Sequence, residues 1–158
     1  MRSVAFLLLL FIVAACSQPR DLNPPDSKDP GKPTILIAML KKSQTAYKQD
    51  LIASIRADYS ARYNVRVLEV GKPKDLEGQE YAALVVMETL KAWLMFNRGL
   101  KQFAQLPDQS KTVYFVSSGD PKWKWKREGL KVVTGATMKA KAADKYPELK
   151  AALDSVLQ

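Results

Sequence analysis

Two of the residue types most often used in catalytic and metal sites, cysteine and histidine, are almost absent from this chain. Its 158 residues include one cysteine, Cys16, and no histidine. This composition excludes Ser-His-Asp and Cys-His nucleophilic catalysis and nearly all zinc and copper sites. A hydrolase built on a Ser-Lys pair has no supporting motif. We therefore expect no metal site, and no residue is assigned a catalytic role. Asp, Glu, Lys, Tyr, Ser and Thr remain for any chemistry, so the composition leaves an enzyme open as an alternative to the favoured role without catalysis.

The cysteine ends an apolar N-terminal segment. Arg2 precedes the run from Val4 to Ala15, which is the layout of a secretory signal. The box Val13-Ala14-Ala15-Cys16 resembles the lipobox of bacterial lipoproteins. That resemblance implies removal of residues 1–15 and lipidation of Cys16. Ser17 then favours sorting to the outer membrane, so we expect a lipid-anchored envelope protein that faces the periplasm. The alternative is a plain secretory signal with an incidental cysteine.

The charge of the chain points to anionic partners. The formal net charge is +9, and loss of Arg2 with the signal leaves +8. An exported basic protein meets lipid headgroups, acidic glycans or a charged cofactor rather than nucleic acid. Dispersed lysines also serve solubility. The expected partners are the membrane, through the N-terminal lipid, and an anionic ligand or an envelope protein; no nucleic acid is expected.

Residues 16–33 predict a lipidated, proline-rich tether. Five of the nine prolines lie between residues 17 and 33, and the segment is nearly free of apolar residues. Such a composition buries too little surface to fold. A disordered tether of this length reaches up to ~50 Å. The folded domain is then expected to occupy residues 34–158.

Strand-like and helix-like segments alternate along residues 34–158. This alternation predicts a mostly parallel sheet with helices on both faces. The link of about a dozen residues before the last strand is near the minimum for a parallel crossover, so the direction of that strand stays open. The closing helix places Pro147 in its first turn. Strands are expected at 34–40, 64–70, 81–87, 112–117 and 130–134, helices at 43–62 and 89–105, and a turn with at most a short helix at 71–78.

This order resembles the flavodoxin-like fold, an α/β three-layer sandwich with about five mostly parallel strands. The similar pieces are Ile35–Ala38, Glu80–Val86, and Leu100–Phe103 leading into Lys111–Gly119. The resemblance implies an FMN site at the carboxyl ends of the strands. The loop 41–45 lacks glycine, and residues 88–93 lack the Gly-Ser/Thr-Pro pattern of that family. The ordinary FMN site is therefore degenerate in this chain.

A second resemblance is local. Residues 133–137 read Val-Thr-Gly-Ala-Thr, similar to the core of exported flavoproteins that carry FMN on a threonine. The resemblance implies Thr137 as the attachment residue, although Lys131 and Lys139 depart from the family pattern. The alternative is a small-residue turn after the last strand, in which Gly135 takes a positive φ and Thr137 caps the next segment.

Two further patterns bear on function. Trp123 and Trp125 alternate with lysines, which suits either a loop that covers the sheet or a platform for a membrane, sugar or flavin. The carboxyl ends of parallel strands meet at one edge, where such sheets bind ligands. The sequence thus predicts a non-catalytic binding module, or alternatively an FMN-binding electron-transfer protein. The candidate cofactor-binding residues are Ser43, Thr45, Ser117, Gly119, Thr134, Gly135 and Thr137.

Overall fold

The computed structural model describes residues 19–23, 28–41, 45–90, 98–120, 122–137 and 142–158. Cys16, Ser43 and the lipobox lie outside these ranges. The strands are β1 (Arg20–Asp21), β2 (Thr34–Leu40), β3 (Asn64–Val70), β4 (Ala83–Leu90), β5 (Thr112–Ser118) and β6 (Lys131–Ala136). The helices are α1 (Ala46–Tyr59), α2 (Arg98–Phe103) and α3 (Ala142–Asp154), with a 3₁₀ turn, η1 (Pro73–Leu76).

The strands form one sheet in the order β1-β3-β2-β4-β5-β6. The five strands from β2 onward are parallel to their neighbours, and the two-residue β1 pairs antiparallel with β3. Counted from β2, the order is 2-1-3-4-5, which is that of flavodoxin-like folds. The predicted fold class is confirmed. The last strand, whose direction the sequence left open, is parallel to β5.

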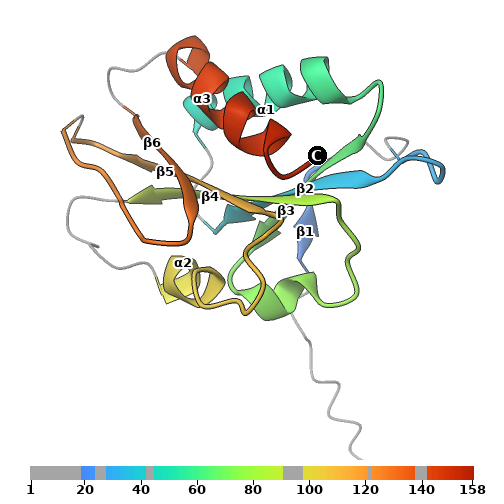
Figure 1. Cartoon of the computed structure of the whole chain (residues 1–158), viewed down its shortest axis with the longest axis horizontal. Helices are drawn as coiled ribbons and strands as arrows, with labels where there is room; N and C mark the ends of the chain where they lie inside the picture. The colour runs from blue at the N-terminus through green and yellow to red at the C-terminus, as the bar shows by residue number, and fades with distance from the viewer. Residues whose placement is uncertain (1–18, 24–27, 42–44, 91–97, 121, 138–141) are drawn as a thin grey trace, which may run out of the picture.

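Helices cover both faces of the sheet (Figure 1). On one face α1 and α3 bury the side chains of alternate strand positions, and the hydroxyl of Tyr59 on α1 donates to Asp154 of α3 at 2.6 Å. The other face packs against α2 and η1. Trp123 and Trp125 also pack against this second core, with the Trp125 ring edge-on to Tyr114. Their position is that of a loop that covers the sheet.

Two expected helices differ from the observed ones. Thr89 and Leu90 continue β4 rather than begin a helix, and the helical residues described after it are Arg98–Phe103. Thr89 remains a strand residue because β4 pairs with Ser117 and Ser118 of β5 at this point. Pro147 lies inside α3, since that helix already includes Ala142. The remaining strands and α1 lie close to the ranges expected from periodicity.

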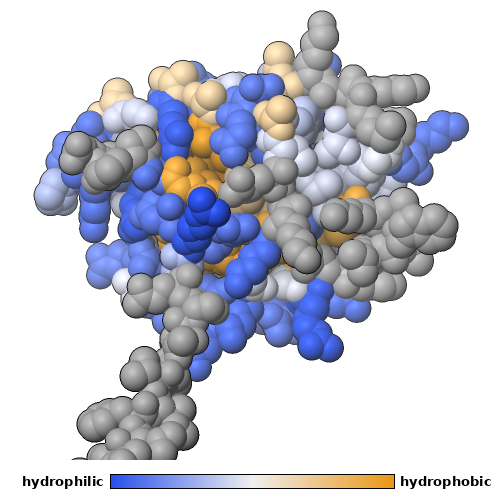
Figure 2. Space-filling model, turned by 180° about the vertical axis from the view of Figure 1, so that it is seen from behind, coloured by the Kyte–Doolittle hydropathy of each residue, from blue (hydrophilic) through white to orange (hydrophobic). Residues whose placement is uncertain are grey.

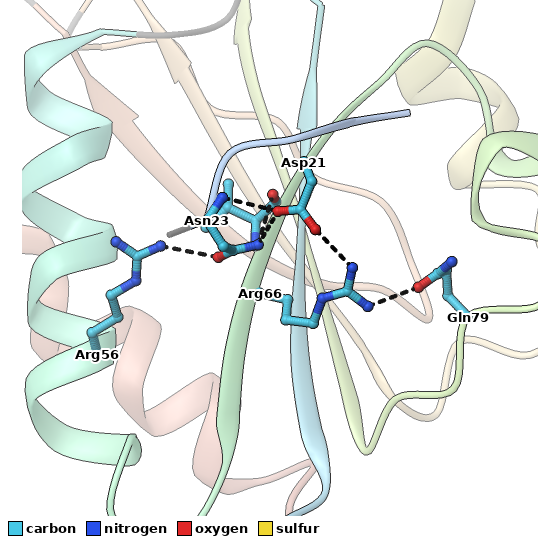
Figure 3. A network of polar contacts seen from close by, with 6 residues as sticks. Asp21, Asn23, Arg56, Arg66 and Gln79 are labelled. Carbon is cyan, nitrogen blue, oxygen red and sulfur yellow. Dashed lines mark hydrogen bonds and ion pairs between the residues drawn. The ribbon is translucent and has the colours of Figure 1, made fainter. Parts of the chain in front are cut away.

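The described part of the proline-rich segment lies against the domain, which differs from the expected disordered tether. The Asp21 carboxylate forms an ion pair with Arg66 at 2.9 Å, and the Arg66 guanidinium also donates a hydrogen bond to the side chain of Gln79 (Figure 3). Asn23 Oδ1 accepts from Arg56 at 3.1 Å and from the Val67 amide at 3.0 Å. The low apolar content of the segment predicted disorder, because little apolar surface can be buried. In the structure, hydrogen bonds and an ion pair hold the described residues against the domain instead.

Asn64 fixes the next part of that segment. Its side chain is 4% exposed. Its Oδ1 accepts from the Asp29 amide at 2.8 Å, and its Nδ2 donates to the carbonyls of Asp29 at 2.7 Å and Lys32 at 2.9 Å. One buried amide therefore satisfies three backbone groups immediately before β2.

Replacing Asn64 by alanine is expected to lower the free energy of unfolding by about 3 kcal/mol, because three backbone groups lose their partner. Urea unfolding followed by tryptophan fluorescence measures the change. Limited proteolysis should then cut within residues 28–33. The matched control is Gln102→Ala on the exposed face of α2, which should leave both readouts unchanged. An Asn64→Ala protein as stable and protease-resistant as wild type would show that this side chain does not hold the segment.

A candidate ligand site at the carboxyl edge of the sheet

The chain reverses its direction of winding between β2 and β4. The crossover from β2 passes through α1 to β3, and the path from β4 passes through α2 to β5, on the opposite face (Figure 1). Open α/β sheets bind ligands outside the carboxyl ends of the strands at such a switch point. The first turn of α1 and the last residues of β4 both lie there, and each supplies a buried charged residue.

Lys48 lies in the first turn of α1 and is fully buried. It occupies the apolar stripe of the helix, three and four positions before Leu51 and Ile52, so packing of that stripe carries it inward. Its Nζ has no hydrogen-bond partner among the residues that the structure describes. Burial lowers the pKa of Lys48 to about 7, and the Glu88 carboxylate opposes this fall.

Glu88 is the second buried charge and is 2% exposed. Its Oε1 accepts the amide of Thr89 at 2.7 Å. Ser117 of β5 donates its hydroxyl to the Glu88 carbonyl at 3.3 Å and lies 3.1 Å from the Thr89 hydroxyl. These contacts join the ends of β4 and β5 into a polar group within an otherwise apolar sheet.

Thr45 caps α1, with its hydroxyl accepting the Lys48 amide at 3.3 Å. The N-cap of α1 is therefore Thr45. Ser43, two residues earlier, lies outside the described ranges. The first turn of α1 carries no acidic residue. The positive end of the helix dipole is thus left without a carboxylate from that turn, a setting that favours an anion.

The other predicted residues divide into two groups. Ser117 is buried in the polar group at the ends of β4 and β5, and Gly119 is exposed after β5. Thr137 lies beside the end of β5, where its amide and hydroxyl both donate to the Ser118 carbonyl, at 3.0 and 3.2 Å. The carboxyl edge thus brings Thr45, Ser117 and Thr137 together, as expected. The hydroxyls of Ser117 and Thr137, however, already donate hydrogen bonds to backbone carbonyls at the ends of β4 and β5.

Gly135 does not occupy the turn that the sequence suggested as an alternative. Thr134, Gly135 and Ala136 are all strand residues of β6, and Gly135 is not among the described glycines with positive φ. A Cβ at this position would lie 2.9 Å from Tyr47 Oη and 3.0 Å from Phe115 Cζ. Glycine is required here by the close approach of two aromatic side chains, not by backbone conformation.

Tyr47 completes the buried side of the site. Its ring packs 5.8 Å from that of Phe115, and its hydroxyl is buried with no partner among the described residues. Burial, together with Asp144 and Glu148, raises the pKa of Tyr47 to about 12. Two neighbouring side chains of α1, Tyr47 and Lys48, therefore each bury a polar atom that no described group satisfies, which is rare in folded proteins.

Sequence reasoning missed Lys48 and recognised Glu88 only as a loop residue. The signal for Lys48 was present, because its spacing from Leu51, Ile52 and Ile55 places it on the stripe that predicted the helix. A lysine on such a stripe is rarely buried without a partner. The signal for Glu88 was weaker, since the strand was expected to end at Met87.

Two hollows in the described surface lie at the opposite, amino edge of the sheet. One of about 690 Å³ lies between residues 28–34 and 78–82, and one of about 460 Å³ is bounded by Tyr81, Asp108 and Lys111. Arg66 and Lys32 at the larger hollow are already ion-paired with Asp21 and Asp29. Within the described ranges no group of three or more acidic, cysteine or histidine residues could hold a metal ion. The described helices are also too short or too polar to cross a bilayer.

Comparison with known proteins adds little to this geometry. No protein-family model matches the sequence, and no curated protein matches it. A similar solved structure is that of the lysine decarboxylase LdcF from Francisella novicida, with a TM-score of 0.48 and 15% sequence identity. The match covers 84% of this chain and 18% of the decarboxylase chain. The chain thus spans less than a fifth of that enzyme, and a likeness at this level carries no inference about function.

Proposed function

We propose that this protein is a lipid-anchored envelope lipoprotein whose flavodoxin-like domain binds an anionic ligand without catalysing a reaction. The observation that carries the ligand part is Lys48, a fully buried amine without a described hydrogen-bond partner at the switch point of the sheet. A phosphate or carboxylate that reached Nζ would supply the missing partner and stabilise the ammonium form. The positive end of α1 favours the same charge.

The anchor rests on the lipobox and is tested separately. Processing that stops in the presence of globomycin, together with loss of membrane association in a Cys16→Ala protein, is the expected result. Outer-membrane fractionation then tests the predicted location. A Cys16→Ala protein that still partitions with membranes would contradict the anchor without bearing on the ligand site.

Binding of inorganic phosphate and of FMN, measured by isothermal titration calorimetry, tests the ligand part. We expect affinity in the micromolar range for at least one of the two, and a loss of about tenfold or more in Lys48→Met, because a charge-assisted hydrogen bond is removed. Lys111→Met, at an exposed position of the amino edge, is the matched control and should bind as wild type. Millimolar or weaker binding of both compounds to wild type would contradict the proposal.

FMN-dependent electron transfer is the second candidate, favoured by the position of Thr137 at the carboxyl edge. Visible absorbance of protein purified from a host with an exported flavin transferase distinguishes the two. Flavin that stays with the denatured chain, and is lost in Thr137→Ala, would support covalent attachment. A colourless protein that takes up no FMN but binds phosphate would support the binding module alone.

A further inference from the structure

The N-terminal segment enters the domain at the same edge as the candidate ligand site. β1 runs antiparallel to β3, with Arg20 opposite Glu69 and Asp21 opposite Leu68. Glu69 is the last residue but one of β3. The chain therefore arrives from the carboxyl end of β3, which in a parallel sheet is the carboxyl edge of every strand from β2 to β6.

The position of β1 leaves little chain between the domain and the lipid. Four peptide units separate Cys16 from Arg20, and a fully extended chain of that length spans at most ~14 Å. The sequence predicts a tether of up to ~50 Å, because the composition of residues 16–33 is that of a free chain. The docked segment consumes most of that length.

Side-chain contacts keep this entry point in place. Asp21 is ion-paired with Arg66, and the pKa of its carboxyl is lowered because the hydrogen bonds from Arg66 and Asn23 outweigh the effect of burial. Asn23 joins the segment to α1 and to the backbone of β3. Leu22 packs against the core, and its amide donates to the Val67 carbonyl at 3.0 Å. The strand is thus held by backbone, side chains and an apolar contact.

The surface beside this entry point carries basic side chains. Arg20, Lys41, Lys72 and Lys74 are exposed there, and a Cβ on Gly71 would lie 3.7 Å from Lys41 Cε, which places that side chain against the turn after β3. The carboxylates in the same region are Glu69, Asp75 and Glu77. Asp75 is held by the amides of Gly71 and Lys72, at 2.7 and 3.2 Å. Figure 2 shows hydrophilic side chains along the lower side of the molecule, the side on which Figure 1 draws α2, with hydrophobic side chains exposed above them.

We propose that the domain docks on an anionic lipid surface through the end of β3 and the turn after it, so that the carboxyl edge of the sheet faces the membrane. The proposal rests on the proposed lipid anchor at Cys16. The short link holds this edge near the headgroups, and Lys41 and Lys72 supply charge complementary to anionic lipid. A ligand bound at Lys48 is then held at the membrane surface.

Fluorescence quenching by a lipid headgroup label tests this orientation. Because Cys16 is the one cysteine of the chain and is acylated under the proposed anchor, a cysteine introduced elsewhere is a unique labelling site in the acylated protein. Ala46→Cys, at an exposed and uncharged position in the first turn of α1 on the carboxyl edge, and Lys111→Cys at the amino edge are labelled with a small fluorophore. Each acylated protein is reconstituted in phosphatidylglycerol and phosphatidylethanolamine vesicles that contain a nitroxide headgroup lipid.

We expect quenching at position 46 to exceed that at position 111 at least threefold, because a strand of seven residues separates the two edges by ~23 Å. Replacing phosphatidylglycerol by phosphatidylcholine should reduce this contrast. Asn23→Ala, which removes the side-chain bonds of the docked segment, should reduce it as well. Equal quenching at the two positions, stronger quenching at position 111, or a contrast unaffected by lipid charge would overturn the docking.

The mass of the purified protein separates failure of the anchor from failure of the docking. A protein without the acyl mass overturns both the anchor and the orientation that depends on it. An acylated protein with the wrong quenching pattern overturns the orientation alone. Circular dichroism of each labelled variant shows whether the fold is retained, and Gln49→Cys, also exposed near the start of α1, is the second carboxyl-edge position if Ala46→Cys is not folded.

Discussion

The free energy of unfolding should rise by about 3 kcal/mol between pH 7 and pH 9.5, and Lys48→Met should abolish that rise. The pKa of Lys48 is about 7 in the folded protein against 10.5 in a solvated lysine. Between these two values the unfolded chain holds a proton at this position that the folded protein has released. Stability therefore increases with pH across this window.

The increase in the free energy of unfolding with pH should end where the tyrosines of the unfolded chain begin to ionise. Burial raises the pKa of Tyr47 and of Tyr114 to about 12, and the pKa values of Tyr59 and Tyr146 are raised as well. Above about pH 10 the unfolded chain loses phenolic protons that the folded protein keeps, so stability falls again. We expect a maximum between these two regimes, and Lys48→Met should lose the ascending limb but keep the descending one.

Urea unfolding at a series of pH values, followed by tryptophan fluorescence, measures both limbs. Lys111→Met is the matched control, because it removes an exposed lysine from the far edge of the sheet. The control should reproduce the wild-type profile. A wild-type profile that is flat between pH 7 and 9.5, or an ascending limb that survives in Lys48→Met, would show that the Lys48 amine is not desolvated.

Gly135→Ala should lower the free energy of unfolding by about 2 kcal/mol, although the change adds a single methyl group in a strand. The added carbon would lie closer to Tyr47 Oη and Phe115 Cζ than unstrained packing allows, at 2.9 and 3.0 Å. Both rings belong to the core between the sheet and α1. The strain falls on Tyr47, whose neighbour in the helix is Lys48.

Tyr47→Phe provides the matched test of this cause. The hydroxyl that it removes is buried and has no partner among the described residues, so the single change should alter stability by less than ~1 kcal/mol. In the Tyr47→Phe background, Gly135→Ala should cost about half as much, because the nearest clashing atom is gone. A double-mutant cycle with no coupling between the two positions would contradict this account of Gly135.

The fold could be predicted because its signals are local and repeated. The apolar runs that became β2, β4 and β5 and the helical spacing of Leu51, Ile52 and Ile55 each specify an element without tertiary information. The direction of β6 could not be predicted, because a link of a dozen residues permits either pairing. In the structure β6 is parallel to β5, and Trp123 and Trp125 of the link pack against the core on the face that α2 and η1 cover.

The sequence predicted the edge of the sheet at which the candidate site lies, but not the residues that form it. Topology brings the ends of β4, β5 and β6 to one edge, so Ser117 and Thr137 lie there as expected. Their hydroxyls, however, donate to neighbouring carbonyls. The burial of Lys48 depends on packing between α1 and the sheet, so no short sequence motif predicts it. The docking of Asp21 and Asn23 was missed for a related reason, since a segment held by polar contacts lacks apolar periodicity.

The most direct test of the ligand site is a titration of the lysine side chains by NMR. Protein labelled with ¹³C at lysine Cε is titrated between pH 5 and pH 11, alone and with inorganic phosphate or FMN, and Lys48→Met assigns the resonance. The account predicts that Lys48 titrates near neutral pH in the free protein. Bound anion should move its midpoint upward by about one unit or more, because an anion stabilises the ammonium form. A Lys48 resonance that titrates like those of the exposed lysines, or one that neither compound shifts, would contradict the proposed anion site.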